Sequence, residues 1–294
     1  RYLPTIHCWE DQRAHQAGWA MTGIYATLTA LIDRLDSTAV AASDVIRWAS
    51  PVPSFGDLTR ATVATLGLNP SNREFVDESG HVLEGALRRF HTLNSLGLRS
   101  WAEVDVRHLR MIVESCEGYF CGNPYDTWFR KLDQVVTAAH ASYYPSTLNL
   151  ACHLDLIPYA TAQKWTALTQ RQRASLLKTA GDALALLLRD CLVRVLILNG
   201  QSVVDHFTNA YGACLVRRSM PNWSLSRASS KPVNGFAYSG LVEELAGVDL
   251  GRKILVLGFN HNLQSSYGVT TGVIEQIRSW VGTTTAEAGL DTTA

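Results

Sequence analysis

Residues 62–75 read Thr62-Val63-Ala64-Thr65-Leu66-Gly67-Leu68-Asn69-Pro70-Ser71-Asn72-Arg73-Glu74-Phe75. A short apolar, β-branched run followed at once by Gly, Asn, Pro and Ser predicts a buried strand that ends in a turn. The polar groups of this stretch therefore lie in the turn. Ligands of open α/β sheets bind just outside the carboxyl ends of the strands, so Asn69 is the first candidate for a catalytic side chain.

The overall composition predicts a globular protein without a general affinity for polyanions. The chain has 294 residues, of which 47% are hydrophobic and 18% charged, and this is enough to bury one large core. Its 26 basic and 26 acidic residues cancel, so a surface that binds nucleic acid has to be a local patch. No run of 18 apolar residues and no signal peptide is present. We expect a cytoplasmic monomer without membrane contact.

The six cysteines are scattered along the chain, and several lie within apolar runs, which predicts free, reduced thiols. Cys116 and Cys121, together with His108, are the strongest candidates for metal ligands. They lack the paired short spacings of structural zinc sites, so we expect neither a metal nor another cofactor.

The chain alternates helices and strands. Residues 1–60 are helical in pattern and are predicted as an N-terminal annex, residues 61–281 as the main α/β domain, and residues 282–294 as a disordered tail. Further strands are predicted at 147–157, 193–198 and 254–257, and helices at 12–35, 44–48, 83–96, 101–140, 170–190 and up to residue 280. We therefore expect a three-layer α/β/α domain with a central four-stranded parallel sheet.

A polar side chain follows or ends each of the four predicted strands, at Asn69, Asp155, Asn199 and Asn260. On the second strand, His153 and Asp155 share one face because side chains alternate along a strand. If the four strands lie side by side, these polar groups converge on one edge of the sheet.

The spelling Gly67-Leu68-Asn69-Pro70-Ser71 resembles motif A of the uracil-DNA glycosylase superfamily, in the Gly-x-Asn-Pro form of its mismatch-specific, thymine and single-strand-selective branches. That superfamily has a motif B after the last strand, where this chain has Asn260-His261-Asn262-Leu263-Gln264-Ser265. This second stretch contains no proline and can be aligned from Asn260 or from His261. The resemblance covers residues 60–280, and motif A is its specific part.

The resemblance implies a monofunctional DNA glycosylase, which hydrolyses the N-glycosidic bond of a flipped-out pyrimidine without a Schiff-base lysine. Asn69 would orient the attacking water, and His261 or backbone N–H groups of residues 260–264 would donate to the leaving base. Leu263 or Gln264 would wedge into the vacated stack. The other residues expected to hold the base are Pro70, Ser71, Asn72, Asp155, Asn260, Asn262 and, as a stacking wall, Phe75.

Asp155 lies where the superfamily commonly has an Asn that reads the pyrimidine edge. An ionised carboxylate only accepts hydrogen bonds, so it repels the O4 of uracil or thymine and attracts the N4 amine of cytosine. We therefore expect a cytosine-type base as the substrate. A modified base is favoured, because a glycosylase for ordinary cytosine would destroy its own genome.

Two basic clusters are candidates for DNA contacts. Arg88 and Arg89 lie in the helix predicted after motif A. Residues 214–241, an insertion between the third and fourth strands, contain no acidic residue and hold Arg217, Arg218, Arg227 and Lys231. Positive charge interleaved with aromatic residues suits phosphate binding and base stacking.

Each of these features also has a purely structural explanation. The Gly-x-Asn-Pro turn can be only a turn, His153 a hydrogen-bonded core histidine, Asp155 a cap or an ion-pair partner, and the basic clusters solvated surface. The alternative functions are a uracil or thymine mismatch repair glycosylase and a glycosylase-like DNA-binding module without activity. Excision of a modified base from phage DNA would serve antiviral defence. An unrelated nucleotide-binding enzyme lacks support, since neither a phosphate-binding loop nor a dinucleotide fingerprint is present.

Overall fold

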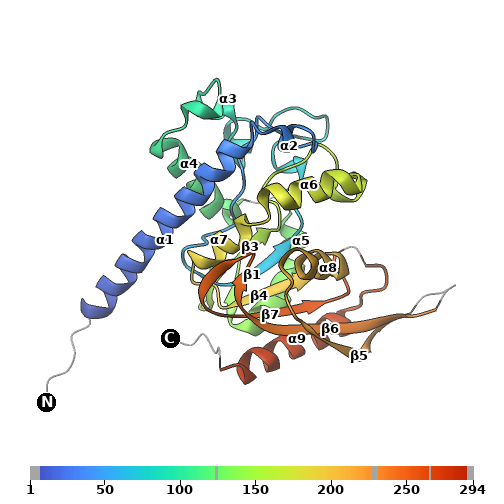
Figure 1. The fold of residues 1–294 in the computed structure, drawn as a ribbon. Coiled ribbons are helices and arrows are strands. Elements are labelled where there is room, and N and C mark those ends of the chain that lie inside the picture. Colours follow the sequence, from blue (N-terminus) through green and yellow to red (C-terminus); the bar gives the residue numbers. More distant parts are fainter. Residues whose placement is uncertain (1–6, 123–124, 227–230, 265, 290–294) are drawn as a thin grey trace, which may run out of the picture.

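The computed structural model describes residues 7–122, 125–226, 231–264 and 266–289. Arg227, a predicted DNA contact, and Ser265, the last residue of the second motif, lie outside the described residues. Figure 1 shows helices packed on both sides of one twisted sheet, with α6 above it and α9 below it in this view.

Within the described residues, the strands form one seven-stranded mixed sheet in the order β2-β3-β1-β4-β7-β6-β5. The first five strands in this order pair in parallel, and β6 and β5 continue the sheet as antiparallel strands. Their bounds are β1 (Ala61–Gly67), β2 (Ala141–Ser142), β3 (Asn149–Asp155), β4 (Val195–Asn199), β5 (Val216–Leu225), β6 (Val233–Leu245) and β7 (Val248–Phe259).

The predicted α/β class is confirmed, and the four predicted strands lie next to one another as β3, β1, β4 and β7. The sheet as a whole is neither four-stranded nor purely parallel. The reason is the insertion between the third and fourth predicted strands, which folds into β5 and most of β6 and so extends the sheet at one side.

The α-helices of the described chain are α1 (His7–Arg34), α2 (Thr38–Ala41), α3 (Leu93–Leu96), α4 (Val106–Glu117), α5 (Asp126–Val136), α6 (Gln170–Ala180), α7 (Ala183–Arg189), α8 (Gln201–Tyr211) and α9 (Thr271–Glu287). Short 3₁₀ turns lie at Asn72–Glu74, Gly85–Leu87, Trp101–Glu103, Tyr119–Cys121, Thr137–Ala139 and Trp165–Ala167.

Each face of the sheet has its own hydrophobic core. On β1, Ala64 and Leu66 pack with buried residues of α1, α4, α6, α7 and α8, whereas Val63 packs on the opposite side with residues of α5 and α9. This follows from the alternation of side chains along a strand. The strands are buried on both faces, which explains their nearly continuous apolar sequence.

The N-terminal annex is joined to the sheet domain by apolar and polar contacts. Leu28 and Leu31 of α1 are fully buried. At the end of α1, the Arg34 guanidinium forms two hydrogen bonds with the Asp182 carboxylate, at 2.6 and 2.7 Å. The Tyr159 hydroxyl, just after β3, donates to the Leu31 carbonyl at 2.7 Å.

Several helix predictions differ from the structure. Residues 44–48 form turns and isolated bridges, because Asp44 adopts a positive φ of 64° that a helix does not allow. Most of 83–96 is irregular, and the segment 170–190 breaks at Gly181 into α6 and α7. Helix α9 continues to Glu287, so part of the predicted disordered tail is helical, and residues 290–294 lie outside the described residues.

The burial of α1 yields a test of its role in stability. We expect Leu31→Ala to lower the free energy of unfolding by about 2–5 kcal/mol, because it removes a fully buried side chain and leaves a cavity. The matched control is Leu87→Ala, since Leu87 is 71% exposed and its truncation should change stability by less than about 0.5 kcal/mol. Urea unfolding of both variants measures the difference, and equal losses would show that α1 is only loosely attached.

Candidate functional site at the carboxyl edge of the sheet

The carboxyl ends of β3, β1, β4 and β7, with the residues that follow them, form what we call the carboxyl edge. Gly67 pairs with Asp155 at the ends of β1 and β3, and Asn199 pairs with Phe259 at the ends of β4 and β7. The chain order reverses at β1, which has β3 on one side and β4 on the other. Such a switch point is where open α/β sheets bind ligands.

The side chain of Asn69 has a defined orientation. Its amide nitrogen donates to the carbonyls of Pro70 and Tyr159, at 3.1 and 3.4 Å, and to the Thr161 hydroxyl at 3.0 Å. Because the Thr161 hydroxyl itself donates to the Gln163 carbonyl, all three partners are acceptors, which identifies the amide nitrogen. The amide oxygen accepts no hydrogen bond from the described residues and is left as a half-buried acceptor.

Asp155 and His153 come together over Gly67. The Oδ1 of Asp155 lies 3.7 Å from the Nε2 of His153, and both side chains are about 95% buried. A Cβ at position 67 would lie 2.3 Å from Asp155 Oδ1 and 2.8 Å from His153 Nε2. A glycine at position 67 is therefore required by the close approach of these two polar groups.

A buried chain of hydrogen bonds sets the tautomer of His153. Its Nδ1 lies 2.7 Å from the Thr65 hydroxyl, which also bonds the Tyr143 hydroxyl. Within the described chain, the Tyr143 hydroxyl has Thr65 as its hydrogen-bond partner. The Tyr143 hydroxyl hydrogen is therefore paired only if Tyr143 donates to Thr65, and the Thr65 hydroxyl then donates to Nδ1. The imidazole proton is then on Nε2, next to the Asp155 carboxylate.

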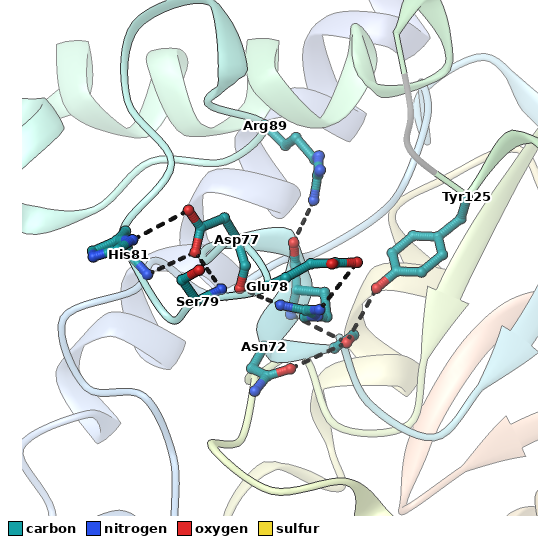
Figure 2. A network of polar contacts seen from close by, with 9 residues as sticks. Asn72, Asp77, Glu78, Ser79, His81, Arg89 and Tyr125 are labelled. Carbon is teal, nitrogen blue, oxygen red and sulfur yellow. Dashed lines mark hydrogen bonds and ion pairs between the residues drawn. The ribbon is translucent and has the colours of Figure 1, made fainter.

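The loop after motif A is held by polar contacts, which Figure 2 shows from close by. The Ser71 hydroxyl accepts from the Arg73 backbone N–H and from the Tyr125 hydroxyl, and the Asn72 amide donates to the Ala162 carbonyl. The Arg89 guanidinium donates to the Arg73 carbonyl. Arg89 therefore fixes this loop, and of the pair Arg88 and Arg89 only Arg88 is exposed.

Glu74 is a buried acid below this loop, with 3% exposure. The Tyr119 hydroxyl donates to its Oε1 at 2.8 Å, while Oε2 has no hydrogen-bond partner among the described residues and lies 3.7 Å from Nη1 of Arg89. Burial raises the pKa of Glu74 to about 7, and the nearby charge of Asp155 contributes in the same direction. The bond from Tyr119 and the Arg89 charge oppose this shift.

The loop after β7 is folded back on the protein. The Nε2 of His261, which is 1% exposed, lies 2.7 Å from the Trp223 carbonyl, and this acceptor requires the proton on Nε2. Burial also lowers the pKa of His261. Its donor is therefore already used, and the prediction that His261 donates to a leaving base is wrong for this conformation.

Asn199 and Asn260 are also occupied by structural contacts. The Asn199 side chain accepts from the Leu263 backbone N–H at 3.1 Å and donates to the Gln264 side chain at 2.7 Å. Asn260 accepts from the Phe236 N–H and donates to the Asn234 carbonyl, both at 2.8 Å. Asn262 accepts from the Gln264 N–H, so it also orders the loop.

Two predicted base or DNA contacts are corrected by their burial. Phe75, the proposed stacking wall, is 1% exposed and packs against Phe90 and Trp48. Leu263, the proposed wedge, is fully buried in the core on the α5 and α9 side. Both side chains stabilise the fold instead. Pro70 is buried, whereas Ser71 is exposed at the carboxyl edge.

The structure brings two aromatic residues to this edge that the sequence pattern did not single out as functional. Trp128 is half-buried, and its ring lies edge-on to His153 with centroids 5.6 Å apart. Its carbonyl accepts from the Gln264 amide. Tyr125 is also half-buried and reaches Ser71. Their helical spacing resembled that of ordinary core positions, so nothing in the sequence distinguished them.

Two surface hollows are lined by neither Asn69 nor Asp155. One of about 610 Å³ is lined by Arg88, Arg89 and Tyr119, and one of about 780 Å³ lies between β5 and the start of α9. The described residues contain no group of three or more His, Cys, Asp or Glu side chains that could hold a metal ion. They also contain no helix long and apolar enough to span a membrane.

No protein-family model matches this sequence, and no curated protein matches it with significant similarity. The function therefore has to be inferred from the residues and geometry of the carboxyl edge.

The buried acid predicts a specific pH dependence of stability. An unfolded Glu releases its proton near pH 4.3, whereas folded Glu74 keeps it until about pH 7. Stability should therefore fall between these two pH values, by about 4 kcal/mol from this group, and the loss should persist above pH 7. Glu74→Gln keeps an acceptor for Tyr119 and should remove this part of the pH dependence.

Urea unfolding at pH 5 and pH 8 for the unaltered protein and for Glu74→Gln isolates the contribution of this carboxyl group. If the two proteins lose the same stability between pH 5 and pH 8, Glu74 does not titrate in the expected range.

Proposed function

We propose that this protein is a monofunctional DNA glycosylase that hydrolyses the N-glycosidic bond of a flipped-out, cytosine-type pyrimidine. The observation that carries the proposal is the fixed orientation of the Asn69 amide at the switch point of the sheet. Asn69 follows Gly67 by two residues, and the side chains of Asp155 and His153 approach each other at Gly67. The ends of the two neighbouring strands β1 and β3 thus carry an acceptor for a water molecule and a polar pair that can read a base.

Asn69 has the geometry of a water-orienting group. Its amide nitrogen is held by Tyr159 and Thr161, so the free oxygen cannot rotate away without losing these bonds. A carboxamide oxygen accepts a hydrogen bond from water but does not remove a proton at neutral pH. Attack on an oxocarbenium-like sugar needs such positioning more than it needs a strong base.

Asp155 and His153 together match the pairing edge of cytosine. The Asp155 carboxylate would accept from the N4 amine, and the Nε2–H of His153 would donate to N3. Uracil and thymine present an acceptor at O4 and a donor at N3, so both contacts would be repulsive. A donor to N3 also stabilises negative charge that develops on the departing base.

Access to this pair requires movement. His153 is 5% and Asp155 6% exposed, so a base can reach them only when surrounding side chains give way. Trp128 covers the His153 ring, and Tyr125 lies over the Ser71 side of the edge. Base binding would therefore displace these two aromatic side chains, which could then stack on the flipped base.

A catalytically silent DNA-binding module is the second candidate. Two observations favour it: His261 Nε2 is hydrogen-bonded to the Trp223 carbonyl, and Leu263 is buried. These two side chains therefore provide neither a donor to the base nor a wedge. Release of any free base separates this candidate from the first.

The role of Asn69 is tested by Asn69→Ala. We expect base release in single turnover to fall roughly 10²–10³-fold while DNA affinity stays within about twofold, because the lost interaction acts mainly in the transition state. Oligonucleotides and genomic DNAs that carry different pyrimidines serve as substrates, and mass spectrometry identifies the released bases. The matched control is Asn94→Ala, which removes an exposed amide remote from the edge. Undiminished release by Asn69→Ala would refute the assignment.

The choice of base is tested by Asp155→Asn. An amide can donate to O4, so this variant should shift release from cytosine-type bases towards uracil-type bases. The ratio of the two released bases, measured from one mixed substrate, is independent of small losses in folding. Efficient release of plain uracil by the unaltered protein, with no release of any cytosine derivative, would support mismatch repair instead.

A further inference from the structure

The strands β5 and β6 form a two-stranded ribbon that extends past the carboxyl edge (Figure 1). The last pair of β6 with β7 is Ala237 with Phe259, the final residue of β7. Residues 233–236 of β6 continue beyond this pair, and β5 is the one described strand that pairs with them. The ribbon therefore projects on the side of the sheet where Asn69 and Asp155 lie.

The loop after β7 holds the base of this ribbon. Asn260 bonds the β6 backbone at Asn234 and Phe236, and His261 bonds the β5 backbone at Trp223. The Trp223 ring is 1% exposed and lies edge-on to Trp280 of α9, with centroids 5.5 Å apart. These contacts fix the direction of the ribbon relative to the carboxyl edge.

Charge is divided along the ribbon. Arg217 and Arg218 pair with Tyr238 and Ala237, level with the end of β7, and Lys231 precedes β6 at the projecting end. All three are exposed and form no ion pair within the described chain. The acidic residues lie at the opposite end, close to the start of β7: Glu243, Glu244 and Asp249.

The Arg217 side chain is ordered by an aromatic contact. Its guanidinium carbon lies 3.7 Å from the centroid of the Phe236 ring on the neighbouring strand. Such stacking leaves the guanidinium N–H groups at the rim free for an anion and reduces the entropy lost on binding. The positive end of the ribbon is therefore preorganised, even though the chain has no net charge.

We infer that the β5–β6 ribbon is an arm that binds the phosphodiester backbone of DNA next to the nucleotide presented to the carboxyl edge. Phosphates would contact Arg217, Arg218 and Lys231. The binding role stands on the ribbon itself, whereas the link to a flipped nucleotide rests on the proposed glycosylase function.

The test is the double variant Arg217→Ala/Arg218→Ala. We expect weaker binding to DNA of every sequence, and a plot of log affinity against log salt that is flatter by about 1–2 units, because each phosphate contact releases counterions. Arg217→Lys/Arg218→Lys should restore most of the salt slope by keeping the charge.

The matched control is Arg60→Ala/Lys253→Ala, which removes two exposed positive charges, one just before β1 and one in the middle of β7. Its salt slope should equal that of the unaltered protein. Equal slopes for the ribbon variant and the unaltered protein, with both folded by thermal melting, would overturn the inference. If the ribbon variant has a flatter slope but neither it nor the unaltered protein releases a base, the DNA-binding role of the ribbon stands and the proposed glycosylase activity is refuted.

Discussion

The pairing of β1 with β3 at Gly67 is the contact on which the candidate site depends. It places Asp155 beside Gly67, and the absence of a Cβ there leaves room for the carboxylate and for the His153 imidazole. Any larger residue would push one of these groups away from the strand or separate the two strands. The turn Gly67-Leu68-Asn69 therefore contributes free space at Gly67 as well as the Asn69 side chain.

Polar side chains at the ends of neighbouring strands divide into two kinds. Asn199 and Asn260 use both donor and acceptor atoms to hold loops and strands, so they are structural. Asn69 uses only its amide nitrogen in this way and retains an acceptor. This difference in hydrogen-bond saturation, and not position alone, separates a group that can act on a ligand from one that maintains the fold.

The neutral net charge of the chain hides a strong local asymmetry. Antiparallel pairing brings Arg217 and Arg218 level with the carboxyl end of β7, while the return strand carries Glu243 and Glu244 towards its amino end. Exposed positive charge therefore lies on the part of β5 that is level with the carboxyl end of β7. Electrostatic steering of a polyanion depends on this distribution, which the total charge does not describe.

The sequence by itself determined the α/β class, the four strands that carry the carboxyl edge and the turn at Asn69. Apolar runs, strand alternation and Gly-Asn-Pro punctuation are local signals, and local signals suffice for these features. The tertiary structure decided that Phe75, His261 and Leu263 are buried, that Trp128 and Tyr125 flank the edge, and that the basic insertion is a ribbon. These features depend on partners far away in the chain, because burial and hydrogen-bond saturation are set by packing between elements.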